Sequence, residues 1–82
     1  MTSKEIDIIY EGVEALLKAK AFEFLDKHLE LMIMSIWRTD IDELIVYLTA
    51  TKCVKSKLPS RAKYFAACNS LFPDQEMWKG LE

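Results

Sequence analysis

The second half of the chain carries a cluster of basic residues that could bind an anion. Residues 51–73 contain five basic side chains and no acidic one, whereas residues 1–50 contain ten acidic and five basic ones. A helix is predicted to begin near Arg61, and the free N–H groups and the dipole at a helix N-terminus attract negative charge. The expected contacts for a phosphate, a nucleic-acid backbone or an acidic protein segment are Lys52, Lys55, Lys57, Ser60, Arg61 and Lys63.

Two interpretations of this basic segment stay open. Runs of charge are usually solvated surfaces, and these cations would then only balance acidic residues elsewhere. Specific nucleic-acid binding is less favoured, because the chain has a net charge of −2 and a pI near 5.4, whereas nucleic-acid-binding domains are typically basic. The helix predicted from Arg61 also has no Asn or Gln in its first turn to read bases. Anion or nucleic-acid binding is therefore the second choice for a function.

Residue types that support catalysis or metal binding are few and widely separated. His28 is the only histidine, and Cys53 and Cys68 do not form the short CxxC or HxxxH spacings of metal sites. The sequence contains no glycine-rich phosphate loop. We expect both cysteines to be reduced and buried as small apolar residues, and His28 to lie at the edge of the core. The chain is predicted not to be an enzyme and to have no metal, cofactor or small-molecule substrate.

The elements that must position these residues are predicted to be helices. The chain has only two glycines and two prolines, which disfavours the many turns of a β-fold. Apolar residues recur at intervals of three and four, as on one face of a helix. The predicted helices cover residues 4–18, 22–37, 41–54 and 61–72, with a short C-terminal helical turn at 75–79. Short links between them predict an all-α fold of two antiparallel helix pairs, a small helical bundle.

Local signals mark the ends of the predicted helices. Ser3 and Ser60 are the expected N-caps of the first and fourth helices, because short polar side chains satisfy free N–H groups there. Thr39 and Asp40 are both good N-caps for the third helix, and Asp40 with Glu43 resembles a capping box. A tight turn near residues 18–21 is predicted between the first two helices, since their apolar stripes do not align. One continuous helix stays the alternative. Gly12 in the first helix either is tolerated at a cost in stability or marks a close crossing with another helix.

The predicted second helix is apolar on nearly all sides, which favours a central place in the bundle or an interface with a second chain. Met34 continues its narrow polar stripe and is predicted to be exposed or covered by a partner. Tryptophan, methionine and arginine are enriched at protein interfaces. The expected interface residues are Leu31, Met34, Trp37, Arg38 and Trp78. The leading hypothesis is therefore a protein-interaction module, as a homodimer or as a small adaptor or regulator that binds another protein.

The length of 82 residues predicts one domain of marginal stability, which we place at residues 1–80. Residues 81–82, Leu-Glu, resemble the junction left by an expression vector, so no function is expected of them. No run of about 18 or more apolar residues predicts a membrane span. The N-terminus also lacks the basic start and long apolar core of a signal peptide. We therefore expect a cytoplasmic protein with no membrane partner.

Overall fold

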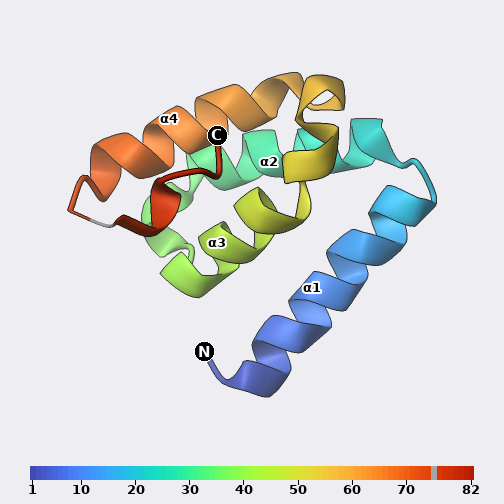
Figure 1. Cartoon of the computed structure of the whole chain (residues 1–82), viewed down its shortest axis with the longest axis horizontal. Helices are drawn as coiled ribbons and strands as arrows, with labels where there is room; N and C mark the ends of the chain where they lie inside the picture. Colours follow the sequence, from blue (N-terminus) through green and yellow to red (C-terminus); the bar gives the residue numbers. More distant parts are fainter. Residues whose placement is uncertain (75) are drawn as a thin grey trace.

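The regular structure of this chain consists of helices (Figure 1). The computed structural model describes residues 1–74 and 76–82, and it describes the side chains of all of these residues except Met77. The α-helices are α1 (Ser3–Lys18), α2 (Phe22–Met34), α3 (Ile41–Ala50) and α4 (Pro59–Leu71), and the 3₁₀ segments are η1 (Ile36–Arg38), η2 (Lys52–Lys57) and η3 (Glu76–Trp78). No strand occurs among the described residues. The predicted all-α bundle is therefore confirmed. None of the helices described has the length and apolar character needed to span a membrane.

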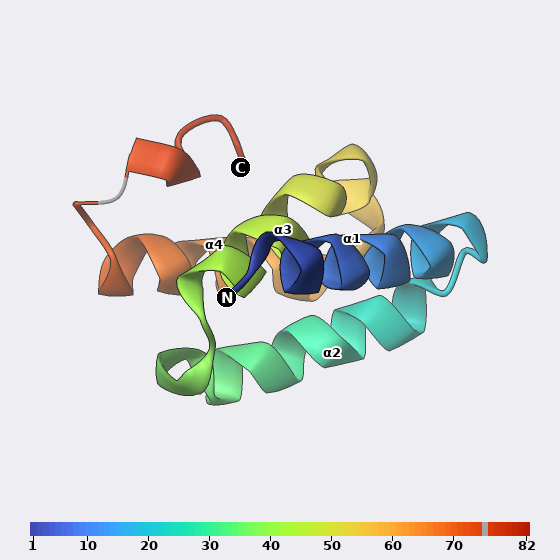
Figure 2. The same ribbon diagram turned by 90° about the horizontal axis from the view of Figure 1, so that it is seen from below.

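Each helix packs mainly against the next helix but one in the sequence. Helices that follow each other in sequence run in roughly opposite directions, as short links require (Figure 2). The most extensive contacts nevertheless join alternate helices, because α2 packs mainly against α4 and α1 mainly against α3. Figure 1 shows α2 lying behind α4, with α3 between this pair and α1. The core is therefore built by helices that are not neighbours in sequence.

The core lies where α2, α3 and α4 meet, and α1 covers one side of it. Leu25 and Leu29 of α2 and Leu44 and Leu48 of α3 have no exposed surface. Burying a leucine side chain contributes roughly 2 kcal/mol, so these residues form the centre of the stabilising contacts. The other buried apolar residues of the same cluster are Val13, Met32, Ile36, Tyr47, Ala50, Leu58, Tyr64, Cys68 and Trp78.

A tight turn at residues 19–21 separates α1 from α2, so the alternative of one continuous helix is wrong. Lys20 has a φ of 55°, in the left-handed region that costs a residue other than glycine about 1 kcal/mol. The backbone N–H groups of Lys20 and Ala21 donate to the carbonyls of Leu17 and Leu16, each at 3.0 Å. These two bonds satisfy carbonyl groups that the end of α1 would otherwise leave free.

Helix α1 differs from the prediction in its N-cap and at Gly12. Thr2, and not Ser3, is the N-cap: its backbone is extended, with φ −80° and ψ 159°, and its Oγ1 accepts a hydrogen bond of 3.2 Å from the N–H of Glu5. Gly12 is exposed, and a Cβ at this position would meet nothing within 4 Å. The close-crossing interpretation is therefore wrong, and the glycine weakens α1 without a packing reason.

The second helix ends at Met34 instead of continuing to Trp37. Ser35 leaves the helical region, with φ −127° and ψ 33°, and its Oγ donates to the carbonyl of Leu31 at 3.2 Å. A hydroxyl that bonds to a nearby carbonyl competes with the regular helix in this way. The chain continues as η1 and enters α3 at Asp40. This residue is the N-cap as predicted, because its Oδ1 accepts a hydrogen bond of 2.9 Å from Asp42 N.

The C-terminal segment folds back against the body of the molecule. α4 ends at Leu71, before Pro73, and the chain then forms η3, followed by Gly80 with a φ of 81°. The indole N–H of Trp78 donates to the carbonyl of Phe72 at 3.0 Å. The start of the helical turn predicted at residues 75–79 lies outside the described residues, and Trp78 within that turn is buried.

Candidate interaction surfaces

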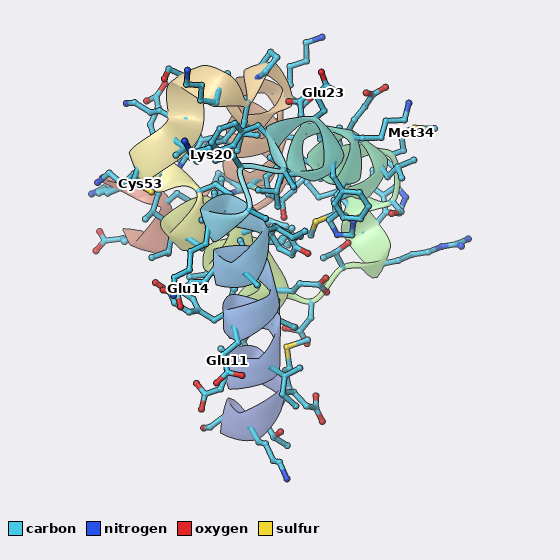
Figure 3. The ribbon with its side chains drawn as sticks, turned by 90° about the vertical axis from the view of Figure 1, so that its right-hand side faces the viewer. Glu11, Glu14, Lys20, Glu23, Met34 and Cys53 are labelled. Carbon is cyan, nitrogen blue, oxygen red and sulfur yellow. The ribbon has the colours of Figure 1, made fainter. Side chains whose placement is uncertain are left out.

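Exposed apolar side chains on α2, and on η1 directly after it, face away from the core. Met34 and Trp37 are 72% and 74% exposed, and Phe24 and Leu31 are each more than half exposed. We call these four residues the outer stripe. Figure 3 shows Met34 and Glu23 directed outward from α2. Sequence reasoning found three of the four. Phe24 was missed as an interface residue, although its spacing of seven from Leu31 places both on one helix face.

Exposed charged residues lie beside the outer stripe. Glu23, Lys27 and Glu30 are exposed on α2, and Arg38 is exposed at the end of η1. The ion pairs of the described residues join Met1 to Asp40 and Lys79 to Glu76, and neither involves these four side chains. Their charges are therefore available to groups outside the chain.

Trp78, the fifth residue expected at an interface, does not lie on the surface. It is buried in the core cluster, and its ring packs against Phe72 with centroids 6.3 Å apart and a tilt of 45°. The indole fills space beyond the end of α4, and its N–H has an acceptor within the chain. The expectation that Trp78 contacts a partner is therefore wrong, because its apolar surface is already covered.

Four of the predicted basic contacts form an exposed surface along η2 and α4. Lys52, Lys55 and Lys57 are exposed on η2, and Lys63 is exposed on α4. The predicted third helix at residues 41–54 ends earlier, at Ala50, and residues 52–57 form the 3₁₀ segment η2, which has a kink at Val54. Cys53 was expected to be buried but is exposed on η2. In Figure 3 it lies on the opposite edge from Met34, so the basic segment and the outer stripe occupy different sides of the molecule.

The N-terminus of α4 is occupied by a side chain of α2, which changes the anion hypothesis. The helix begins at Pro59, a residue well suited to its first position, and Leu58 rather than Ser60 takes the cap position with φ −125° and ψ 83°. The backbone N–H of Ser60 donates to Oδ1 of Asp26 at 2.7 Å. The predicted N-cap role of Ser60 is therefore wrong, and a carboxylate of the chain itself fills the place expected for an external anion.

Arg61 does not belong to the open basic surface. Its side chain is only 2% exposed, and burial lowers the pKa of its guanidinium. Nε donates to Oγ1 of Thr51 at 3.1 Å, and Nη2 donates to the carbonyls of Leu48, at 2.7 Å, and Leu81. The expectation that Arg61 contacts a ligand on the outer surface is wrong, because the guanidinium points into the protein and joins α3, α4 and the C-terminal segment.

His28, Cys68 and Tyr64 lie in or beside the core. His28 stacks on Tyr47 with ring centroids 5.1 Å apart. Cys68 is fully buried, and burial raises the pKa of its thiol to about 11, so it stays protonated at neutral pH. Burial also raises the pKa of Tyr64, whose hydroxyl has no hydrogen-bond partner within the described part of the chain. Within residues 1–74 and 76–82 no group of three or more histidine, cysteine or acidic side chains is placed to hold a metal ion.

Comparison with known proteins gives no relative for this arrangement. No family model matches the chain, no curated protein is detectably similar to its sequence, and no solved structure matches its fold. The chemistry of the two surfaces is therefore the basis for a proposed function.

Proposed function

We propose that this chain is a non-catalytic protein-interaction module that associates with a second copy of itself through the outer stripe of α2. The observation that carries the proposal is the exposure of four large apolar side chains, those of Phe24, Leu31, Met34 and Trp37, each of which is more than half exposed. Large apolar and aromatic side chains gathered in this way mark surfaces that bind proteins.

The charges beside the outer stripe favour a second copy as the occupant. Two α2 helices packed antiparallel, with Leu31 near the two-fold axis, bring Phe24 of one copy close to Trp37 of the other. The same arrangement directs Glu23 toward Arg38 of the second copy, twice by symmetry. The face is therefore complementary to itself in both apolar character and charge, as a symmetric dimer interface requires.

Light scattering coupled to size-exclusion chromatography tests this association. We expect a mass of twice 9.5 kDa at high micromolar concentration. Leu31→Glu places an unpaired charge at the centre of the interface and should weaken dimerisation by at least about tenfold. Ile8→Glu is the matched control, because Ile8 is 60% exposed on α1 and lies outside the outer stripe. A monomer at every concentration would overturn the proposal.

A charge exchange tests the antiparallel register separately. Glu23→Arg and Arg38→Glu should each weaken dimerisation by about threefold, and the double variant should restore it, because each ion pair is then re-formed with reversed sign. If the two single changes simply add in the double variant, Glu23 and Arg38 do not face each other.

Anion or nucleic-acid binding remains the second proposal, and it rests on the four exposed lysines of η2 and α4. It is supported less well, because Asp26 occupies the start of α4 and Arg61 is buried. Titration with single- and double-stranded DNA and RNA across salt concentrations tests it, since phosphate contacts give a linear fall of log affinity with log salt. Absence of binding at low salt would remove it.

We also propose a cytoplasmic location. The two cysteines, Cys53 and Cys68, are both free thiols, which fits a reducing compartment. Fractionation of the source cell with detection of the chain tests the location.

A further inference from the structure

Helix α1 is held against the rest of the molecule mainly by a single other helix. It packs mainly against α3 and contacts α2 much less. Val13 is its only fully buried residue, and α1 extends away from the other helices in Figure 3. An element attached in this way can be replaced by the same element of a second copy of the chain, because the second copy offers identical contacts.

The turn at residues 19–21, which lets α1 fold back onto α3, opposes the helix preference of its own sequence. Lys20 has a left-handed backbone with φ 55°, which residues other than glycine disfavour. Leucine, lysine and alanine, the residue types at positions 16–21, are strong helix formers, and no glycine or proline occurs between Val13 and Leu58. The local sequence therefore favours one helix through the turn, whereas the packing of α1 on α3 keeps the turn closed.

Opening this turn exchanges hydrogen-bond partners and loses none. In the closed turn the N–H groups of Lys20 and Ala21 donate to the carbonyls of Leu17 and Leu16, respectively. In a continuous α-helix the same two N–H groups donate to the carbonyls of Leu16 and Leu17, respectively. The open form therefore keeps both bonds and releases the left-handed conformation of Lys20.

A continuous helix from Ser3 to Met34 directs α1 away from its own α3. The 16 residues of α1 then extend about 24 Å beyond the start of α2. Val13 lies about 120° around the helix axis from Leu25, which faces the core of its own copy. The inner side of α1 and the surface of α3 that it leaves both lose their cover, and α3 and α1 of a second copy restore it.

We infer that two copies of this chain exchange their α1 helices about the turn at residues 19–21, so that α1 of each copy packs on α3 of the other. The exchanged dimer keeps the contacts that α1 makes in one copy and removes the left-handed Lys20 from both. Association costs translational and rotational freedom, so the exchanged form is favoured at high protein concentration. It goes beyond the dimer proposed above, because it uses no residue of the outer stripe.

Isotope-filtered NMR of a mixed dimer tests the exchange. The host is the full chain with Leu31→Glu, in which association through the outer stripe is weakened. Equal amounts of ¹³C-labelled and unlabelled chain are refolded together from urea at millimolar concentration, and light scattering coupled to size-exclusion chromatography identifies the dimer. We expect nuclear Overhauser contacts from the Val13 methyl groups of labelled copies to α3 protons of unlabelled copies.

Two glycine variants in the same host test the role of the turn. Lys20→Gly should raise the dissociation constant of the exchanged dimer by at least about tenfold, because glycine adopts the left-handed conformation freely and disfavours the continuous helix. Lys18→Gly is the matched control. Lys18 is exposed and belongs to α1 in both forms, so this change should alter the dissociation constant by less than about twofold.

Three outcomes would overturn the inference. The first is a refolded Leu31→Glu chain that stays monomeric at millimolar concentration; if the wild-type chain still dimerises, the outer-stripe proposal stands without the exchange. The second is a dimer in which every Val13 contact lies within one copy. The third is an equal effect of Lys20→Gly and Lys18→Gly. Crossed Val13 contacts in a Leu31→Glu dimer as stable as the wild-type dimer support the exchange and remove the outer stripe as the interface.

Discussion

Helices α1 and α4 differ in how well the apolar pattern of the sequence corresponds to the burial of side chains. α1 has a regular stripe of aliphatic residues over four turns, yet Val13 is its only fully buried residue. α4 has a weak apolar pattern, and it buries Arg61, Tyr64 and Cys68 completely or nearly so. The difference teaches that periodicity indicates which face of a helix turns inward, while the depth of burial is set by the neighbours that the fold supplies. In Figure 3, α1 extends away from the other helices.

The largest expected effect falls on α4. Arg61→Ala should lower the free energy of unfolding by about 3 kcal/mol, because it leaves Leu48 O, Thr51 Oγ1 and Leu81 O without their donor and opens a cavity. Urea unfolding followed by circular dichroism measures the change. Lys63→Ala, on the exposed side of the same helix, is the control and should change stability little. If Arg61→Ala lowers the free energy of unfolding by less than Val13→Ala does, the contrast between α4 and α1 is removed.

The next effect is a loss of stability at high pH that originates in α4. The pKa of Cys68 is about 11 in the folded protein against an ordinary value of 9.0, so the unfolded chain loses its thiol proton first as the pH rises. Stability should therefore be constant with respect to this group below about pH 9 and fall by roughly 1 kcal/mol per pH unit up to about pH 11. Burial raises the pKa of Tyr64 as well, which adds to the fall above pH 10, the ordinary tyrosine pKa.

Urea unfolding at a series of pH values measures this dependence. Cys68→Ala should reduce its slope, and Cys53→Ala, at the exposed cysteine, should leave the slope unchanged. Equal slopes in all three proteins would show that Cys68 titrates in the folded state as it does in the unfolded chain.

A smaller effect is expected in α1. Val13→Ala should lower the free energy of unfolding by about 1.5 kcal/mol, whereas Ile6→Ala, at a half-buried position of the same stripe, should cost less than about 1 kcal/mol. Thermal or urea unfolding at low protein concentration measures both. Equal costs would indicate that the stripe of α1 is covered more completely in solution than within one copy of the chain.

The smallest effect has the opposite sign. Gly12→Ala should raise the free energy of unfolding by up to about 1 kcal/mol, because alanine favours the helix and the position is open. Glu11→Ala, at the preceding exposed position, controls for a general effect of alanine on α1. A destabilised Gly12→Ala protein would mean that another chain or helix approaches this side of α1.

Much of the fold could be predicted because its signals are local. The turn before Phe22, the N-cap Asp40 and the stop before Pro73 all follow from neighbouring residues. The pairing of α2 with α4 and the approach of Asp26 to Ser60 could not, because the latter contact joins residues 34 positions apart. The residues next to Asp26 and Ser60 in the sequence give no sign that these two side chains meet.

The exposed residues of the outer stripe could be predicted better than the residues that depend on contacts distant in sequence. The exposure of Leu31, Met34 and Trp37 follows from their places on α2 and η1, opposite the core-facing leucines. The burial of Arg61 and Trp78 depends on the C-terminal segment folding back over α4, a tertiary event without a local signal. The charge of Arg61 predicted anion binding and the aromatic ring of Trp78 predicted a protein interface. In the structure both side chains are buried and contribute to packing.

The alternating contacts between helices also set the order in which the chain can acquire structure. Because α1 packs mainly on α3, and α2 mainly on α4, a nascent chain that has emerged only as far as α2 lacks both of its principal packing surfaces. Neither half of the sequence is a self-sufficient hairpin, so stable folding on the ribosome has to wait until α4 has left the exit tunnel. Cooperativity in this small protein is therefore a property of the whole chain, and a fragment ending before Pro59 should stay largely unstructured.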